Sequence, residues 1–388
     1  MTSLAAVAVI LNAKSNACLH LSLKFSPWTH SDHIVTTRSR KACTGQLSIT
    51  LVTIAVIKVN GKNGRFVVPM NLQRLCSHAG DFADEEKERK KIGIEREGDI
   101  FFWILFLLLA MLKLGLVQMK VAPDVHINLQ RAAHFVKDLA QRGARMVALP
   151  ECFNSPYGTS YFGKYAEQIP DGPSVKALST MARENGVYLV GGSIPERDGN
   201  QLYNTSTVFD SDGNLIAKHR KVHLFDIDIP GQITFKESSI LSAGQNITMF
   251  DTKEWGKMAV AICYDMRFPE MAQIAARKGC NVLLYPGAFN MTTGPMHWEL
   301  LLRSRANDNQ VFVAGIAPAR DESASYVSWG HSMACDPFGR VMATVDGGQE
   351  DTVLVDIDFA IMQQVRERIP VTKQRRFDVY PDVSSSLV

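Results

Sequence analysis

The sequence has no apolar run long enough to cross a membrane as a helix. Such a helix needs roughly 20 consecutive apolar residues. The longest run covers residues 100–112 and holds 13 apolar residues before Lys113. It reaches the required length only by continuing through residues 114–117, which we expect to form a strand of a folded domain. We therefore predict no membrane association, with an anchor at this position as the alternative.

Sequence features of bound cofactors and metals are also scarce. Gly191-Gly192 follows an expected strand but lacks the lysine and the spacing of a phosphate-binding loop. His219 and His223 are four residues apart, which is the spacing of metal ligands on a helix. The chain between them reads as strand and turn, however, and no third ligand stands nearby. We expect neither a cofactor nor a metal.

Paired cysteines are lacking. The chain has seven, an odd number, and they are scattered without the spacing of a disulfide framework. This pattern is typical of free thiols in a reducing compartment, so we expect a cytoplasmic protein. Mitochondria are the alternative, because the stretch before Asp32 has no acidic residue and carries Lys14 and Lys24, which weakly resembles a transit peptide.

Charge is divided unevenly along the chain. Residues 1–112 carry 14 Lys and Arg against 9 Asp and Glu, whereas the rest carries 28 against 30. The second part lacks the basic face of a nucleic-acid-binding protein. The first part has apolar pieces without an amphipathic pattern, so we expect an extension that is largely disordered or non-native. A folded domain over 113–379 and a tail over 380–388 would follow it.

The part after the extension alternates apolar strands with amphipathic helices, which is typical of an α/β fold. A hairpin turn over residues 210–214 and a second turn over residues 336–339 add antiparallel strands. The last core strand is expected at 353–358. The first expected elements, alternately strand and helix, cover 114–119, 128–142, 145–149, 173–184 and 188–191.

Cys263 stands between an apolar strand and a helix that begins with proline. Residues 257–262 form the apolar run of a strand buried on both faces, and Pro269 fits the first turn of a helix over 268–278. A thiol at such a turn feels the positive end of the helix, which favours the reactive thiolate. The alternative is an inert cysteine of the core.

Two other expected strand ends carry charged residues. The strand over 145–149 runs into Glu151, and Lys221 closes a basic run that lies between apolar stretches. Ligands of open α/β sheets gather beyond the carboxyl ends of the strands, so Glu151 and Cys263 can face one crevice. For the basic run alone, a solvated strand end is the alternative.

Together these segments resemble the glutamate, lysine and cysteine motifs of the nitrilase superfamily of carbon–nitrogen hydrolases. The motifs occur in that family's order, and the resemblance extends over about residues 113–379. It implies an α-β-β-α layered sandwich that commonly forms homodimers. The motif segments are 148–151, 219–226 and 262–270, and the segments 154–158, 191–196 and 285–290 look most like the omega-amidase branch.

The resemblance implies a chemical role for each motif residue. Amide hydrolysis by a thiol needs a group that accepts and donates protons, and positive charge where the oxyanion forms. Glu151 would take the Cys263 proton, pass it to the departing ammonia and then activate water. Lys221 and the backbone N–H of Tyr264 would hold the oxyanion. Glu237 would orient Lys221, and its alternative is a solvated loop acid.

Substrate binding rests on fewer residues. Arg267 can pair bidentately with a substrate carboxylate, and its alternative is a salt bridge to Asp265 or Glu270. Tyr157 and Phe289 are candidate pocket walls, with core packing as the alternative. The omega-amidase branch implies that the partners are water and a short 2-oxo dicarboxylic acid monoamide, namely 2-oxoglutaramate or 2-oxosuccinamate.

Rival functions stay open at this point. A Cys-His pair is the usual way to activate a thiol, and four histidines are available, namely His219, His223, His297 and His331. None stands in a recognisable signature, and His297 begins an expected helix, where capping or packing is its default role. Within the superfamily a nitrilase, a carbamoyl-amide hydrolase or an N-acyltransferase is the alternative. Outside enzymes, the alternative is a binding protein that keeps the fold without the reaction.

Overall fold

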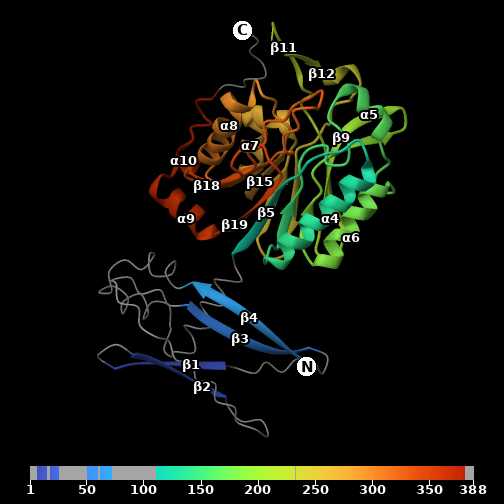
Figure 1. Cartoon of the computed structure of the whole chain (residues 1–388). Coiled ribbons are helices and arrows are strands. Elements are labelled where there is room, and N and C mark those ends of the chain that lie inside the picture. Colours follow the sequence, from blue (N-terminus) through green and yellow to red (C-terminus); the bar gives the residue numbers. More distant parts are fainter. Residues whose placement is uncertain are drawn as a thin grey trace. The chain divides into compact units, whose positions relative to one another are not determined.

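The computed structural model describes residues 111–231 and 233–380, and four strands between residues 7 and 71 (Figure 1). The chain divides into two compact units, Met1–Phe106 and Leu107–Val388. In the first unit two antiparallel hairpins are described, β1 (Val7–Lys14) with β2 (Cys18–Phe25) and β3 (Thr50–Val59) with β4 (Lys62–Asn71). The predictions for the apolar run up to residue 110 and for residues 381–388 lie outside the described residues.

Two β-sheets form the centre of the second unit (Figure 1). The first sheet has the order β10-β9-β7-β6-β5-β19, and β8 pairs with β9. Its strands are β5 (Leu112–Gln118), β6 (Met146–Ala148), β7 (Tyr188–Val190), β8 (Ile194–Asp198), β9 (Gln201–Phe209), β10 (Leu215–Arg220) and β19 (Asp351–Ile357). The second sheet, in chain order, is β13 (Thr248–Thr252), β14 (Gly256–Val260), β15 (Cys280–Pro286), β16 (Phe312–Ile316), β17 (Met333–Cys335) and β18 (Val341–Thr344).

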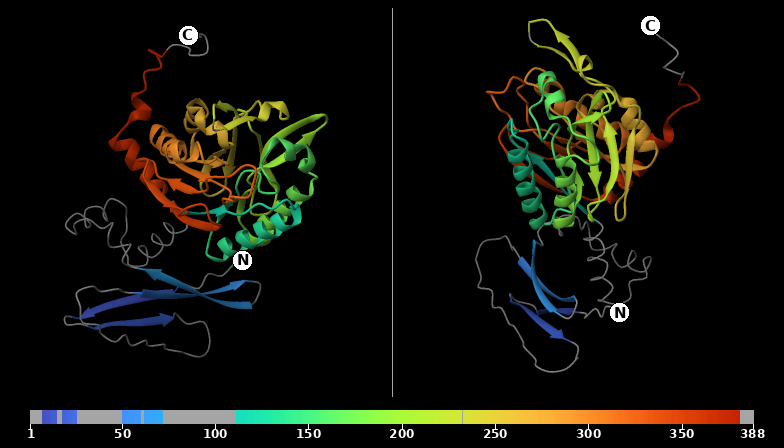
Figure 2. Two further views of the ribbon diagram at one scale, coloured as in Figure 1. Left: turned by 45° about the horizontal axis from the view of Figure 1, so that its top comes forward. Right: turned by 90° about the vertical axis from the view of Figure 1, so that its right-hand side faces the viewer.

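Helices cover the outer faces of both sheets (Figure 2). The first sheet is covered by α4 (Val125–Gln141) and α6 (Pro173–Asn185), and the second by α7 (Pro269–Arg277) and α8 (Gly294–Asn309). This confirms the predicted α-β-β-α sandwich. The remaining elements are α5 (Thr159–Tyr165), the hairpin β11 (Asp226–Ile229) with β12 (Ile233–Lys236), α9 (Phe359–Arg368) and α10 (Val371–Gln374). No helix among the described residues is both long and apolar enough to span a membrane.

Strand β6 illustrates how the core is shared between layers. Met146 and Ala148 belong to the apolar core between the two sheets, whereas Val147 belongs to the core beneath α4 and α6. Successive side chains of a strand point to opposite faces of the sheet. Both faces are buried here, and this explains why the strand appears in the sequence as a continuous apolar run.

The predicted turns and the last strand are confirmed. Strands β9 and β10 pair antiparallel across the turn at residues 210–214, and β17 pairs with β18 across residues 336–339. Strand β19 is the last strand and lies antiparallel beside β5.

Two helices begin earlier than predicted, and at α4 a capping residue gives the reason. The side chain of Asp124 accepts hydrogen bonds from the backbone N–H groups of His126 and Ile127, so α4 begins at Val125. Helix α8 begins at Gly294 rather than at His297, with Pro295 in its first turn.

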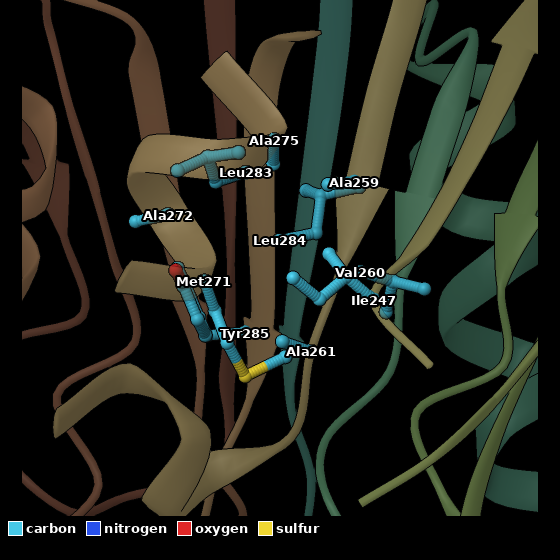
Figure 3. A pocket seen from close by; sticks show the side chains of 10 residues that line it. All are labelled: Ile247, Ala259, Val260, Ala261, Met271, Ala272, Ala275, Leu283, Leu284 and Tyr285. Carbon is cyan, nitrogen blue, oxygen red and sulfur yellow. The ribbon is translucent and has the colours of Figure 1, made fainter. Parts of the chain in front are cut away.

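A small apolar pocket lies between α7 and the strands β14 and β15 (Figure 3). Its lining residues are Ile247, Ala259, Val260, Ala261, Met271, Ala272, Ala275, Leu283, Leu284 and Tyr285. An ordered water needs two or more polar partners, and this lining offers few. The pocket is therefore a packing gap behind the strand that leads to Cys263.

Candidate active site

Three motif side chains meet beyond the carboxyl ends of strands. Glu151 follows β6, Lys221 follows β10, and Cys263 follows β14 as the first residue of η2 (Cys263–Arg267), a short 3-10 helix. All three are buried, with at most 3% of each residue exposed. The structure thus brings the glutamate, lysine and cysteine of the three motifs into one site.

Lys221 lies between two buried carboxylates. Its Nζ is 3.2 Å from Glu151 Oε1, and it is 3.0 Å and 2.8 Å from Oε1 and Oε2 of Glu237. Glu237 begins η1 (Glu237–Ser239) and is fully buried. With both carboxylates ionised, this cluster carries a net negative charge away from water. A further negative charge placed beside it is therefore unfavourable.

Glu151 is held in place by two more donors. Its Oε1 accepts a hydrogen bond of 2.8 Å from Asn204 Nδ2, and its Oε2 accepts one of 2.6 Å from the backbone N–H of Ala288. Neighbouring Gly192 has φ +58°, and a Cβ there would lie 2.1 Å from the carbonyl oxygen of Pro150. Only glycine fits this position, so the close approach of the two chain segments just before Glu151 depends on it.

Glu237 is anchored from its other side. The Tyr157 hydroxyl donates a hydrogen bond of 2.8 Å to its Oε1, and the backbone N–H of Phe225 donates one of 2.7 Å to its Oε2. Tyr157 also stacks on Phe235 and lies close to Tyr326. It therefore fixes the second glutamate rather than lining the cleft described below, where it was predicted as a wall.

Burial and neighbouring charges set the protonation states. Burial raises the pKa of the Cys263 thiol well above its ordinary value, and Glu151 raises it further. Burial also raises the pKa of Glu151, although Lys221 opposes this. Burial alone would lower the pKa of Lys221, but the two carboxylates reverse the shift and raise it. The start of the helix favours a thiolate, but burial and Glu151 outweigh it and favour the protonated thiol.

The backbone at Cys263 is strained and tightly enclosed. Cys263 has φ 47°, a left-handed conformation that is costly for a residue with a side chain. A Cβ on Gly287 would lie 3.1 Å from Cys263 Cα, so the strand end of β15 approaches the nucleophile closely. The turn holds the sulfur at one position. The conformational energy of this left-handed backbone is offset by the packing of the surrounding fold.

Asp265 joins the cysteine turn to the lysine turn. Its Oδ1 accepts hydrogen bonds from the backbone N–H groups of Val222 and His223, and it also contacts His223 Nδ1. Its Oδ2 accepts a hydrogen bond from the backbone N–H of Ile262 and contacts His219 Nε2. Although burial opposes it, this set of donors holds the pKa of Asp265 well below its ordinary value. A single ionised carboxylate therefore bridges the segments that carry Lys221 and Cys263.

A narrow cleft opens at the Cys263 side chain. Its lining residues are Phe225, Cys263, Tyr264, Arg267, Ala288, Phe289, Thr293 and Tyr326. Tyr264, Arg267 and Phe289, three of the predicted substrate-binding residues, thus line this cleft. Among the described residues Arg267 makes no salt bridge, so the predicted alternative of a pair with Asp265 or Glu270 is not observed.

Three of the histidines considered as activators of the thiol have other partners. His219 and His223 contact Asp265 rather than the thiol, and His331 stacks on Trp329. No group of three or more potential metal ligands is found in the part of the chain that the structure describes.

Three residues that contact the site were missed at the level of sequence. Asn204 and Tyr326 lie far from the motifs along the chain, and only the fold brings them to Glu151 and to the cleft. Asp265 stands inside the cysteine motif, and its position two residues after Cys263 was the available signal. At the level of sequence it is only a candidate salt-bridge partner of Arg267.

A family model, curated relatives and a solved structure all place the chain among the carbon-nitrogen hydrolases. Residues 113–367 match the family model of the carbon-nitrogen hydrolases. Omega-amidase NIT2-A of Xenopus laevis is 58% identical over 273 residues, which is 70% of this chain and 98% of that protein. Human omega-amidase NIT2 is 54% identical over 268 residues, 69% of this chain and 96% of that protein. The crystal structure of Saccharomyces cerevisiae Nit3, a member of branch 10 of the nitrilase superfamily, superposes with a TM-score of 0.64 at 46% identity, and covers 69% of this chain and 97% of its own.

Proposed function

The chain belongs to the carbon-nitrogen hydrolase family, and on that premise we propose that it is an omega-amidase. It hydrolyses the terminal amide of short 2-oxo dicarboxylic acid monoamides, 2-oxoglutaramate and 2-oxosuccinamate, to the dicarboxylate and ammonia. The observation that carries this proposal is the buried cluster of Glu151, Lys221, Glu237 and Cys263 beside a cleft that contains Arg267.

In the first half-reaction Cys263 attacks the amide carbon. A thiolate formed beside two carboxylates would be unfavourable, so the proton moves from sulfur to Glu151 as the carbon–sulfur bond forms. The net charge of the cluster then stays constant. The carbonyl oxygen becomes an oxyanion between the Lys221 ammonium and the Tyr264 N–H, each donor being worth on the order of 3 kcal/mol. The first N–H groups of η2 lack intrahelical acceptors, which leaves the Tyr264 N–H available.

Collapse of this intermediate breaks the carbon–nitrogen bond. Glu151 gives its proton to the nitrogen, ammonia leaves, and a thioester remains on Cys263. In the second half-reaction Glu151 takes a proton from water, the hydroxide oxygen attacks the thioester, and the proton returns to sulfur. Asn204 and the Ala288 N–H hold the two carboxylate oxygens of Glu151 through both steps.

Arg267 supports the choice of substrate class. It contributes a guanidinium to the cleft that contains Cys263, and among the described residues no carboxylate neutralises it. A guanidinium pairs bidentately with a carboxylate. Arg267 can therefore pair with the distal carboxylate of a dicarboxylic acid monoamide in this cleft.

Two properties of the whole protein complete the proposal. We propose a homodimer, since Met296 and Leu300 on one face of α8 are 54% and 59% exposed. Exposed apolar side chains on one face are typical of a surface that a partner covers.

We also propose a reducing compartment, the cytoplasm or alternatively mitochondria. Four cysteines of the second unit, Cys152, Cys263, Cys280 and Cys335, are free thiols.

Ammonia release from a substrate panel tests the reaction. The purified protein would receive 2-oxoglutaramate, 2-oxosuccinamate, glutamine, a ureido acid and an aliphatic nitrile at equal concentrations. We expect the two 2-oxo acid amides to give the highest kcat/KM. A preference for the ureido acid or the nitrile would identify a carbamoyl-amide hydrolase or a nitrilase instead. Inactivity on all five would favour a binding protein.

A further inference from the structure

The guanidinium of Arg267 is enclosed by rings. Its Cζ lies 4.9 Å from the centre of the Phe289 ring and 5.6 Å from that of Tyr264. Cation–π contacts of this kind do not use the N–H groups of the guanidinium as hydrogen-bond donors. A guanidinium on a flexible side chain needs a polar contact to select one orientation.

His297 makes that polar contact. Arg267 Nη1 lies 3.2 Å from His297 Nδ1. A guanidinium can only donate hydrogen bonds, so Nδ1 must accept, and the imidazole is therefore neutral with its proton on Nε2. An acceptor without charge orients the arginine and leaves its positive charge available to an anionic ligand.

Helix α8 provides the frame for this contact. Arg305 donates hydrogen bonds from Nε to the Met266 carbonyl (2.9 Å) and from Nη2 to the Arg267 carbonyl (3.0 Å). Trp298, next to His297, packs edge-on against Phe289 at 5.1 Å between ring centres. One helix thus holds the backbone of Arg267, the ring beneath its guanidinium and, through His297, the guanidinium itself.

We propose that His297 is a positioning residue that determines specificity for a substrate carboxylate. It acts through Arg267 by fixing the guanidinium fork for the distal carboxylate, and it takes no part in the chemistry at Cys263. This proposal rests on the proposed function. It predicts that His297 affects KM for anionic amides and leaves kcat unchanged.

Two variants and two substrates test it. His297→Phe keeps a ring but removes the acceptor, whereas His297→Asn retains a side-chain oxygen that can accept from Arg267. Each would be assayed with 2-oxoglutaramate and with the matched amide in which a methyl group replaces the distal carboxylate. A net hydrogen bond corresponds to roughly three- to tenfold in affinity. We expect His297→Phe to raise KM for 2-oxoglutaramate by that factor at unchanged kcat, with no change for the methyl analogue, and His297→Asn to restore KM.

A double-mutant comparison separates positioning from general packing. Once Arg267→Lys has removed the fork, adding His297→Phe should raise KM no further. A fall in kcat, equal losses on both substrates, failure of His297→Asn to rescue, or additive losses in the double variant would overturn the proposal. If any of these four results is obtained while the wild type hydrolyses 2-oxoglutaramate, the proposed amidase function is not contradicted. A wild type that does not distinguish the two substrates would instead contradict the proposed function, and the role of His297 with it.

Discussion

Each carboxylate of the site meets a different set of partners at the residue scale. Glu151 contacts Lys221 and accepts from a backbone N–H beside Cys263, and burial raises its pKa. Glu237 faces the other side of the ammonium and is saturated by Tyr157 and Phe225. The first is placed to carry a proton between sulfur, nitrogen and water. The second is placed to hold the lysine.

Substituting each glutamate separately tests this division of roles. Glu151→Gln keeps the shape but cannot exchange protons, so kcat should fall by roughly 10²–10⁴ or more. Glu237→Gln keeps an acceptor for Lys221 and should cost about tenfold, the value of one hydrogen bond. Steady-state ammonia release would measure both. Equal losses in the two variants would show that the roles are assigned wrongly.

Arg267 carries the prediction about substrate class. Arg267→Lys replaces a bidentate fork by a point charge, so KM for 2-oxoglutaramate should rise by about one to two orders of magnitude. An amide without the distal carboxylate should lose little, because it never used the contact. The comparison of KM for the two amides decides the question. If both lose activity alike, Arg267 is a structural residue rather than a substrate-binding one.

Asp265 is the main link between elements. It joins the turn after β10 to η2, and each of these segments presents one reactive side chain to the site. The raised energy of the left-handed Cys263 backbone also has to be offset by contacts of this kind. We therefore expect the geometry of the site to depend on Asp265, although it does not touch the substrate cleft.

Asp265→Asn should lower both stability and kcat. A buried carboxylate that loses its charge leaves donors without a matched acceptor, which costs about 3 kcal/mol. Because its pKa is depressed in the folded protein, this carboxylate stabilises the fold above its unfolded pKa of about 4, and the stabilisation is lost as pH falls. The Tm of the wild type should therefore drop more steeply below about pH 4 than that of the variant. Parallel Tm curves would contradict this account.

The limits of sequence reasoning are visible in the same elements. The strands before Glu151 and Cys263 are local apolar runs that end in turn residues, so their ends were predictable. Helix η2 is too short to have a periodic signature, and the prediction placed only a helix over residues 268–278 there. The contacts of Asp265 and Tyr157 join residues 46 and 80 positions apart, and no local pattern reports such contacts.

At the scale of the whole molecule, the second unit, Leu107–Val388, holds every candidate site residue. Its two sheets share one apolar core, and the family match begins at residue 113. A variant that starts at Leu107 should therefore keep kcat/KM for 2-oxoglutaramate within about twofold of the full chain. The full chain, purified in parallel, is the control. A loss of more than tenfold would give residues 1–106 a role in the reaction or in folding.

The same site also shows why the cysteine could not be judged by itself. The start of the helix favours a thiolate, whereas burial beside Glu151 raises the pKa of the Cys263 thiol and favours its protonated form. We therefore expect the reactive form to arise during the reaction, by transfer of the proton to Glu151. The central claim is that Cys263 carries the acyl group of the substrate.

Mass spectrometry of the protein quenched during turnover of a slow amide tests this claim most directly. We predict a mass increase equal to the acyl group, located on the peptide that contains Cys263 and absent from Cys263→Ala, which should be inactive but folded. Cys263→Ser should also be nearly inactive, because a carboxylate does not appreciably deprotonate a hydroxyl group. Turnover of Cys263→Ala within tenfold of wild type, or an adduct on another residue, would contradict the account.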